Sequence, residues 1–117
     1  MYKILILLKR KAGTTREEFK AHYEQHHVPM GVRILRGNVK YQRRYLSETY
    51  LSNPLSESPI EGEFDAVTEI WCRDREAWLA TRKLIAEAAV EVSDDRKQYI
   101  ERSQMYFIEE ELESPIT

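Results

Sequence analysis

The chain has 117 residues, of which 42% are hydrophobic and 32% are charged, and its formal net charge is −2. This length and composition fit one globular domain with a substantial core and exclude a disordered chain. The charge balance gives no reason to expect nucleic acid, and the longest apolar run, Ile4 to Leu8, is far shorter than the roughly 20 residues of a membrane span. We expect no nucleic-acid or membrane partner, one domain over residues 1–113 and a tail at 114–117.

Two features of the sequence bear on cellular location. The first residues lead directly into a strand pattern and show no signal peptide with a small-residue cleavage site. The single cysteine, Cys72, excludes an internal disulfide framework. Both features favour a cytoplasmic protein.

The charges are unevenly distributed along the chain. Residues 1–44 hold eleven Lys or Arg and three acidic residues, whereas the remaining residues hold seven and seventeen. One interpretation is an ordinary solvated surface. The other is a pair of oppositely charged faces that assist self-association or attract an anionic substrate.

Periodicity and turn residues divide the chain into four strands and intervening helices. The apolar run near the N-terminus is typical of a strand buried on both faces. Thr15 and Glu18 have the spacing of a capping box, and Pro29 disfavours helical geometry in the residue before it. The predicted elements are a strand at 2–11, a helix from Arg16 to about Val28, a second helical stretch from Gly31 to Leu35, a strand at 39–50, a loop at 51–63, a strand at 64–72, a helix from Asp74 to about Glu91, a short helix from Ser93 that carries Tyr99 and Ile100, and a strand at 104–112.

This order of elements is that of the α+β, ferredoxin-like βαββαβ fold with a four-stranded antiparallel sheet. In that fold two helices cover one face of the sheet. Ile4 to Leu8 is apolar on both sides, so the second face also needs a cover that one chain does not supply. Two sheets packed face to face across a two-fold axis provide it. The sequence therefore predicts a homodimer, a dimeric α+β barrel.

Several short motifs carry a resemblance to a known family. They are Leu8-Lys9-Arg10-Lys11 with Gly13 and Arg16-Glu17-Glu18-Phe19, then His22-Tyr23 with His27 and Pro29, then Phe64-Asp65 with Glu69 and Trp71, and finally the acidic run Glu109 to Glu111. In this order the motifs resemble the EthD family of the dimeric α+β-barrel superfamily. The resemblance implies acid–base chemistry of the lyase, cyclase or isomerase type on a small aromatic or polyketide-like molecule, with no bound cofactor.

The three histidines are the first candidates for this chemistry. At 100° per residue Phe19, His22, Tyr23 and His26 share one helix face, so His22 should line a pocket between helix and sheet. We predict His22 and His27 as catalytic, because the ordinary pKa of histidine suits a general base, and His26 as substrate-binding. The alternative is a structural role at the helix end. His22 and His26 also have a metal-ligand spacing, but no further ligands accompany them and we predict no metal site.

Further candidates lie on the strands. Asp65, Glu69 and Trp71 have the same parity and should point to one face of the third strand. The carboxylates suit the orientation of a histidine or, alternatively, ion pairing with Arg43 or Arg44. Arg10 suits an anionic substrate group or a surface ion pair. Tyr41 and Tyr45 suit hydrogen bonds to a phenol or carbonyl, or simple packing.

Three functional hypotheses follow from these residues. The first is a cofactor-independent enzyme in which a histidine removes a proton next to a carbonyl. The second is a cofactor-free monooxygenase with the same pocket. The third is a non-catalytic dimeric ligand-binding or accessory protein.

Overall fold

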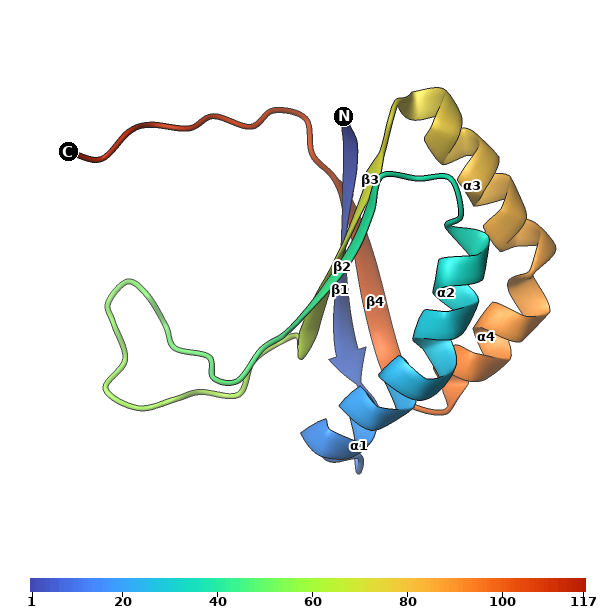
Figure 1. Ribbon diagram of the computed structural model, residues 1–117. Helices are drawn as coiled ribbons and strands as arrows, with labels where there is room; N and C mark the ends of the chain where they lie inside the picture. Colours follow the sequence, from blue (N-terminus) through green and yellow to red (C-terminus); the bar gives the residue numbers. More distant parts are fainter.

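The computed structural model describes the backbone of residues 1–117 and all side chains except those of Val92, Ser93, Asp95 and Arg96. One layer is an antiparallel four-stranded sheet and the other is a set of helices that cover one face of it (Figure 1). The strand order, β2-β3-β1-β4, is that of the predicted ferredoxin-like plan. The elements are β1 (Tyr2–Arg10), α1 (Arg16–His22), the π-helical turn η1 (Tyr23–His27), α2 (Val28–Ile34), β2 (Lys40–Tyr45), β3 (Ala66–Cys72), α3 (Arg75–Glu87), α4 (Ala89–Lys97) and β4 (Ile100–Phe107).

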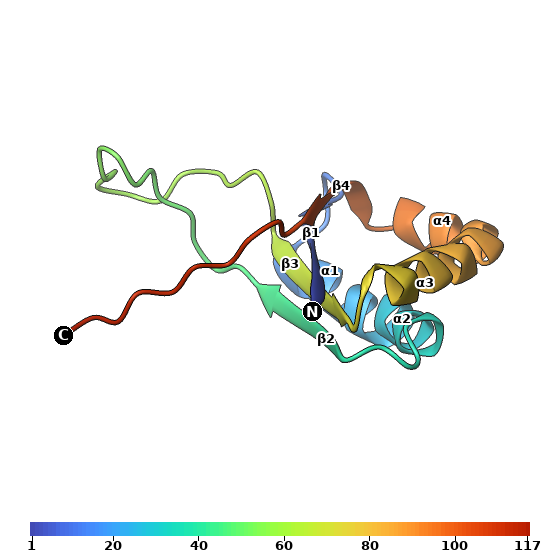
Figure 2. The same ribbon diagram turned by 90° about the horizontal axis from the view of Figure 1, so that it is seen from above.

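The central strand β1 presents apolar side chains to both faces of the sheet, as predicted. Ile4 and Leu8 are buried in two core clusters beneath the helices, where Phe19 and Trp78 cover them. The alternate residues Leu5 and Leu7 point to the opposite face, because successive strand residues alternate. No helix covers that second face, which we call the open face (Figures 1 and 2).

The helix that follows β1 begins as predicted but does not end where predicted. The Thr15 hydroxyl accepts a bond from the Glu18 amide, and the Glu18 carboxylate accepts one from the Thr15 amide, which completes the capping box. The predicted break near Val28 is wrong, because helical backbone continues through α1, η1 and α2 to Ile34. The wide η1 turn, in which the Val28 amide donates to the Tyr23 carbonyl five residues back, directly precedes Pro29 and accommodates it.

The later element boundaries also differ from the prediction. Strand β2 ends at Tyr45 instead of residue 50, and β3 begins at Ala66 instead of residue 64. Strand β4 begins at Ile100, which pairs with Arg10, so the region predicted to be helical is the start of a strand. The predicted helix start at 93–95 falls inside α4, and the capping side chains Ser93 and Asp95 lie outside the described side chains.

Two segments leave the two-layer body on the side of the open face (Figures 1 and 2). We call residues 46–63, between β2 and β3, the finger. Strand β4 ends at Phe107, so the tail begins at residue 108 instead of the expected residue 114, and from here on the tail means residues 108–117. Within the described part of the chain, no helix is both long and apolar enough to span a membrane.

Candidate functional site

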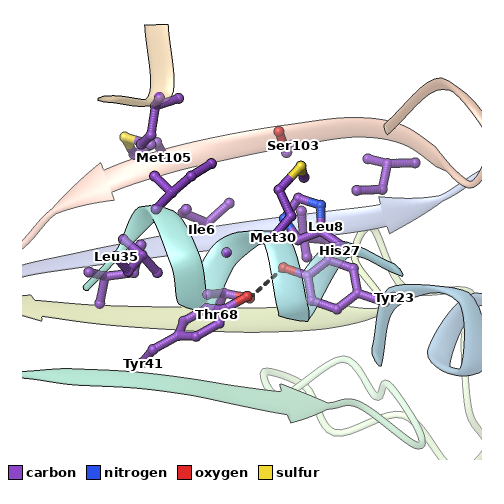
Figure 3. A pocket seen from close by; sticks show the side chains of 15 residues that line it. Ile6, Leu8, Tyr23, His27, Met30, Leu35, Tyr41, Thr68, Ser103 and Met105 are labelled. Carbon is purple, nitrogen blue, oxygen red and sulfur yellow. Dashed lines mark hydrogen bonds between the residues drawn. The ribbon is translucent and has the colours of Figure 1, made fainter. Parts of the chain in front are cut away.

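A cavity of about 210 Å³ lies between the helix layer and the sheet. Its walls come from η1, α2 and α3 on the helix side and from all four strands on the sheet side (Figure 3). The described lining residues include no Lys, Arg, Asp or Glu. They are Ile6, Leu8, Tyr23, His27, Met30, Gly31, Ile34, Leu35, Tyr41, Thr68, Ile70, Ile85, Ile100, Ser103 and Met105. The cavity is therefore apolar with a few polar groups, the composition typical of small-molecule sites.

His27 is the histidine among the described lining residues of this cavity. It is the last residue of η1, and its imidazole stacks on the ring of Tyr23 with centroids 4.5 Å apart and planes inclined by 24°. Tyr23 is itself buried, so the imidazole that lines the cavity packs on a buried ring. A histidine held in this way suits proton transfer to or from a bound molecule.

Hydroxyl groups form the second polar feature of the cavity. The phenol of Tyr23 lies 3.1 Å from the Thr68 hydroxyl, and Tyr41 lies beside them from β2 (Figure 3). Burial raises the pKa of Tyr23 above the ordinary value for a phenol, and it raises that of Tyr41 far above this value. Both side chains are therefore neutral at physiological pH and can donate a hydrogen bond.

Gly31 allows Tyr41 to reach the cavity. A Cβ atom at this position of α2 would lie 3.1 Å from the Tyr41 hydroxyl oxygen, which is closer than ordinary packing permits. The glycine thus gives the phenol space directly beside the helix.

An ion pair between Arg43 and Glu24 contacts both Tyr41 and Tyr45. Arg43 donates two hydrogen bonds to Glu24, at 2.6 and 3.1 Å, and Tyr45 donates a third to the same carboxylate. The Arg43 guanidinium also lies 5.3 Å from the centre of the Tyr41 ring, a cation–π distance. This pair connects η1 with β2 at the edge of the cavity.

The Glu24 pair gives a pH-dependent prediction for stability. The hydrogen bonds from Arg43 hold the pKa of Glu24 below its ordinary value despite partial burial. A carboxylate with a lowered folded-state pKa stabilises the protein above its unfolded-state pKa, and this contribution is lost as pH falls through the folded value. Because both side chains are partly exposed, we expect Glu24→Gln to cost about 1 kcal/mol at pH 7 and nothing measurable near pH 2. Urea unfolding at the two pH values measures this, with Glu57→Gln in the finger as the control; an equal loss at both would contradict it.

The structure places His22 and His26 outside the cavity lining. His22 packs on Tyr99, with ring centroids 4.1 Å apart, and on His26, at 4.5 Å. The expected place of His22 in the lining differs from the structure, because its ring packs against the buried Tyr99 instead. The η1 turn begins only after His22 and acts on the residues beyond it: His27 stacks on Tyr23, and both line the cavity with Met30.

Arg10 and Asp65, two further predicted site residues, form an ion pair at the end of β1. The Asp65 carboxylate accepts bonds from the Arg10 amide and guanidinium, at 2.9 and 3.2 Å, and Lys9 and Arg16 lie within 4.0 Å of it. Asp65 is buried and fixes the start of β3 against the end of β1. The pair lies away from the cavity lining, as does Tyr45.

The remaining predicted residues, Glu69 and Trp71, lie on the open face. Arg44 donates to Glu69 at 3.1 Å, which is one of the two ion-pair alternatives expected from the sequence. Burial alone would raise the pKa of Glu69, but the Trp71 indole N–H and Arg44 outweigh it and lower the pKa. The Trp71 ring lies between the ammonium groups of Lys3 and Lys40, at 3.9 and 4.4 Å.

The cavity thus brings together two of the nine predicted residues, His27 and Tyr41, with Tyr23, Thr68 and Ser103, which sequence reasoning did not assign to a site. The position of Tyr23 could have been predicted, because at 100° per residue it shares a helix face with Phe19. Thr68 and Ser103 gave none, because single hydroxyl residues on strands are common. Among the described residues, no cluster of three His, Cys, Asp or Glu side chains is placed to hold a metal ion.

Comparison with solved structures identifies the same fold in several bacterial proteins. An EthD family protein from Bacillus halodurans superposes with a TM-score of 0.63 at 18% identity, over 95% of this chain and 100% of its own. An EthD-like protein from Ralstonia eutropha gives 0.62 at 18% identity, over 90% and 88%. A DABB family protein with a ferredoxin-like fold from Mesorhizobium loti gives 0.57 at 12% identity, over 99% and 97%.

Sequence comparison places the chain in a family. No curated protein sequence matches it significantly. The family model described as the EthD domain matches residues 11–103, a span that begins just after β1 and includes all of the helices, β2, β3 and the start of β4. The chain therefore belongs to the EthD domain family, with a ferredoxin-like α+β fold.

Proposed function

We propose that this protein is a cofactor-independent enzyme of the lyase, cyclase or isomerase type. It acts by acid–base chemistry on a small, uncharged aromatic or polyketide-like carbonyl compound. The observation that carries the proposal is that His27 lines an apolar cavity together with the protonated phenols of Tyr23 and Tyr41. The unpaired, buried Cys72 supports a cytoplasmic location.

The chemistry follows from the roles that these groups can fill. Neutral His27 accepts a proton from the carbon next to the substrate carbonyl, and the electron pair of the broken C–H bond moves to the carbonyl oxygen as an enolate. Tyr41 and Tyr23, which line the same cavity as His27, donate hydrogen bonds to this oxygen where its charge develops. The imidazolium then returns the proton to a different atom, or to a leaving group, which completes an isomerisation, cyclisation or elimination.

The substrate class follows from the lining. A cavity of about 210 Å³ is smaller than the range of roughly 300–1,000 Å³ usual for ligand pockets, so a molecule with one ring fits best. The described lining offers no charged partner for a carboxylate or phosphate, and desolvation of such a group would be unfavourable. These properties favour an uncharged ketone.

The test uses acetophenone as a probe, because it has one ring, one carbonyl and slowly exchanging methyl protons. The protein in D₂O should accelerate deuterium incorporation into the methyl group, followed by proton NMR, in a saturable manner. Saturable binding without exchange would favour the non-catalytic binding protein. Oxygen consumption with a dihydroxy-aromatic compound would favour the monooxygenase.

Tyr41 gives a separate prediction for this reaction. Tyr41→Phe removes the hydroxyl but keeps the ring that packs beside Gly31 and Arg43. Because loss of one oxyanion donor typically costs about 10²-fold in rate, we expect kcat for exchange to fall by about that factor while KM changes little. Tyr45→Phe, outside the cavity lining, is the matched control. A change in KM alone would assign Tyr41 to binding and remove it from the chemistry.

We further propose that the protein works as a homodimer joined through the open faces of two sheets. Leu5, Leu7 and Val67 form the centre of this face, and they are neighbours in the register of β1 and β3. Joining two such faces buries the apolar row, and an obligate interface of this kind typically buries about 2,000 Å² or more. The dimer would be the eight-stranded barrel expected from the sequence.

A further inference from the structure

The finger, residues 46–63, has a defined shape although it stands away from the body (Figure 1). Its two sides are joined by a bridge between Thr49 and Ile60, where the Ile60 amide donates to the Thr49 carbonyl at 2.8 Å. Nearer the tip, the Ser56 amide donates to the Leu51 carbonyl at 3.1 Å, and the Ser56 hydroxyl accepts from the Leu51 amide at 3.0 Å. The finger is therefore a hairpin whose two sides and tip are both held by hydrogen bonds.

The tip of this hairpin presents apolar side chains to solvent. Leu51 is 54% exposed and Leu55 is 74% exposed, and Tyr50 and Ile60 are also exposed. Exposure of several large apolar groups on one short hairpin is unfavourable, and an isolated two-stranded hairpin is marginally stable in water. A structured apolar tip of this kind is typical of a segment that binds another surface.

The finger and the tail lie on the same side of the sheet as the open face, and the helices lie on the other (Figures 1 and 2). The radius of gyration is 16.0 Å, whereas a compact chain of this length has about 13 Å. The two projecting segments account for the excess. They flank the face that the proposed dimer covers, so a second copy seated there would lie between them.

The charges of the tail and of the open face are complementary, which also favours a second copy of this chain on the open face. The tail carries Glu109, Glu110 and Glu113, whereas basic residues lie on the strands of the open face. Register and ring contacts assign to that face Lys3, Lys9, Lys40, Arg44 and Arg102. One contact of this type exists within the chain, where Lys3 pairs with Glu111 at 2.8 Å. A second copy seated on the open face would bring its own basic residues close to the tail residues Glu109, Glu110 and Glu113.

We propose that the finger and the tail are a clasp that grips a second copy of this chain across the open faces. The apolar tip of the finger packs on the partner copy, and the acidic tail pairs with its basic residues. The inference rests on the proposed homodimer and adds that these two segments supply part of its affinity. It also assigns a role to the uneven charge of the sequence.

The first test weakens the finger without disturbing the body. Leu51→Ser combined with Leu55→Ser alters only exposed side chains, so the fold should persist. We expect the dimer dissociation constant, from sedimentation over a range of concentrations, to rise at least about tenfold, because two buried leucines would be lost from the interface. Val90→Ser is the matched control, since Val90 is 77% exposed on α4, on the helix side. An unchanged constant in the double variant would overturn the clasp and leave the dimer proposal intact.

The second test places the finger on the partner directly. In a Glu57→Cys variant, a thiol-reactive spin label should attach to the new cysteine alone, because Cys72 is fully buried. The spin-labelled variant, at natural isotope abundance, is mixed with ¹⁵N-enriched wild-type protein. In mixed dimers the spin label should broaden amide signals of the wild-type copy. An excess of wild-type protein without ¹⁵N should remove the broadening. Absence of broadening in mixed dimers would overturn the clasp. If the wild-type protein sediments as a monomer at all concentrations, the dimer proposal itself fails.

The tail has its own test. Glu110→Lys combined with Glu113→Lys should raise the dimer dissociation constant severalfold at low salt, and the difference from wild type should shrink at 0.5 M NaCl because exposed charges are screened. Glu87→Lys at the end of α3 is the control. A variant that dimerises as well as wild type at low salt would exclude the tail from the clasp.

Discussion

Replacing His27 with glutamine is expected to lower the rate of acetophenone deuteration by about 100-fold or more, the usual effect of removing a general base. Glutamine keeps a polar group of similar length at the end of η1, so the cavity and the fold should persist. The same substitution at His22 is the control, because His22 packs on Tyr99 outside the cavity lining. A large loss in His22→Gln with little change in His27→Gln would reverse the assignment of the base.

The His27 prediction includes a pH profile. Only neutral imidazole accepts a proton, so the wild-type rate should rise with pH and level off once His27 has lost its proton. The midpoint should coincide with the midpoint of the His27 signal in an NMR titration. A profile that follows the titration of His22 or His26 would contradict the proposed role of His27.

Replacing Leu7 with glutamate is expected to abolish the dimer and to prevent stable folding at micromolar concentration. Leu7 lies opposite Val67 on β3 at the centre of the open face. The cations nearest to it in the register, Lys9 and Arg44, already pair with Asp65 and Glu69, so a carboxylate there would lose water without gaining a partner of its own. Desolvation of an unpaired charge costs several kcal/mol, which is a large part of the stability of a domain of this size. Sedimentation and circular dichroism measure the two effects.

Val90→Glu provides the control for Leu7→Glu, because it adds the same charge to an exposed apolar position on the helix side. It should leave both folding and dimerisation unchanged. A Leu7→Glu protein that remains a folded dimer would show that the open face is not the interface. A wild-type protein that is a folded monomer would refute the dimer.

The fold could be predicted from sequence because its signals are local and mutually consistent. The apolar run of β1, the capping box at Thr15 and the order of elements were sufficient for the ferredoxin-like plan. The faces of β1 follow from alternation, so the need for cover on both sides was also evident. The least predictable boundaries were those set by tertiary pairing, such as the start of β4, where Ile100 pairs with Arg10.

The candidate site was predicted less completely, and one reason lies in the helix that follows β1. His22 lies on the side of Phe19, as a regular helix predicts, but both rings pack on Tyr99 and His22 stays outside the cavity lining. The wide η1 turn, which begins after His22, places His27 in the lining. Nothing in the local sequence other than Pro29 indicates such a turn. Glu69 lies on β3 and pairs with Arg44, one of the two partners that the sequence suggested. Asp65 lies just before β3 and pairs with Arg10 from β1, a pairing between distant segments that the sequence did not indicate.

The most direct test of the central claim, that His27 contacts the substrate in the cavity, is a titration of the histidine Cε1–H signals with acetophenone. The chain has three histidines, so three signals report separately on three positions. The His27 signal should shift in a saturable manner, while those of His22 and His26, outside the cavity lining, should stay in place. Saturable shifts confined to His22 or His26, or no shift at any histidine at saturating probe, would contradict the claim.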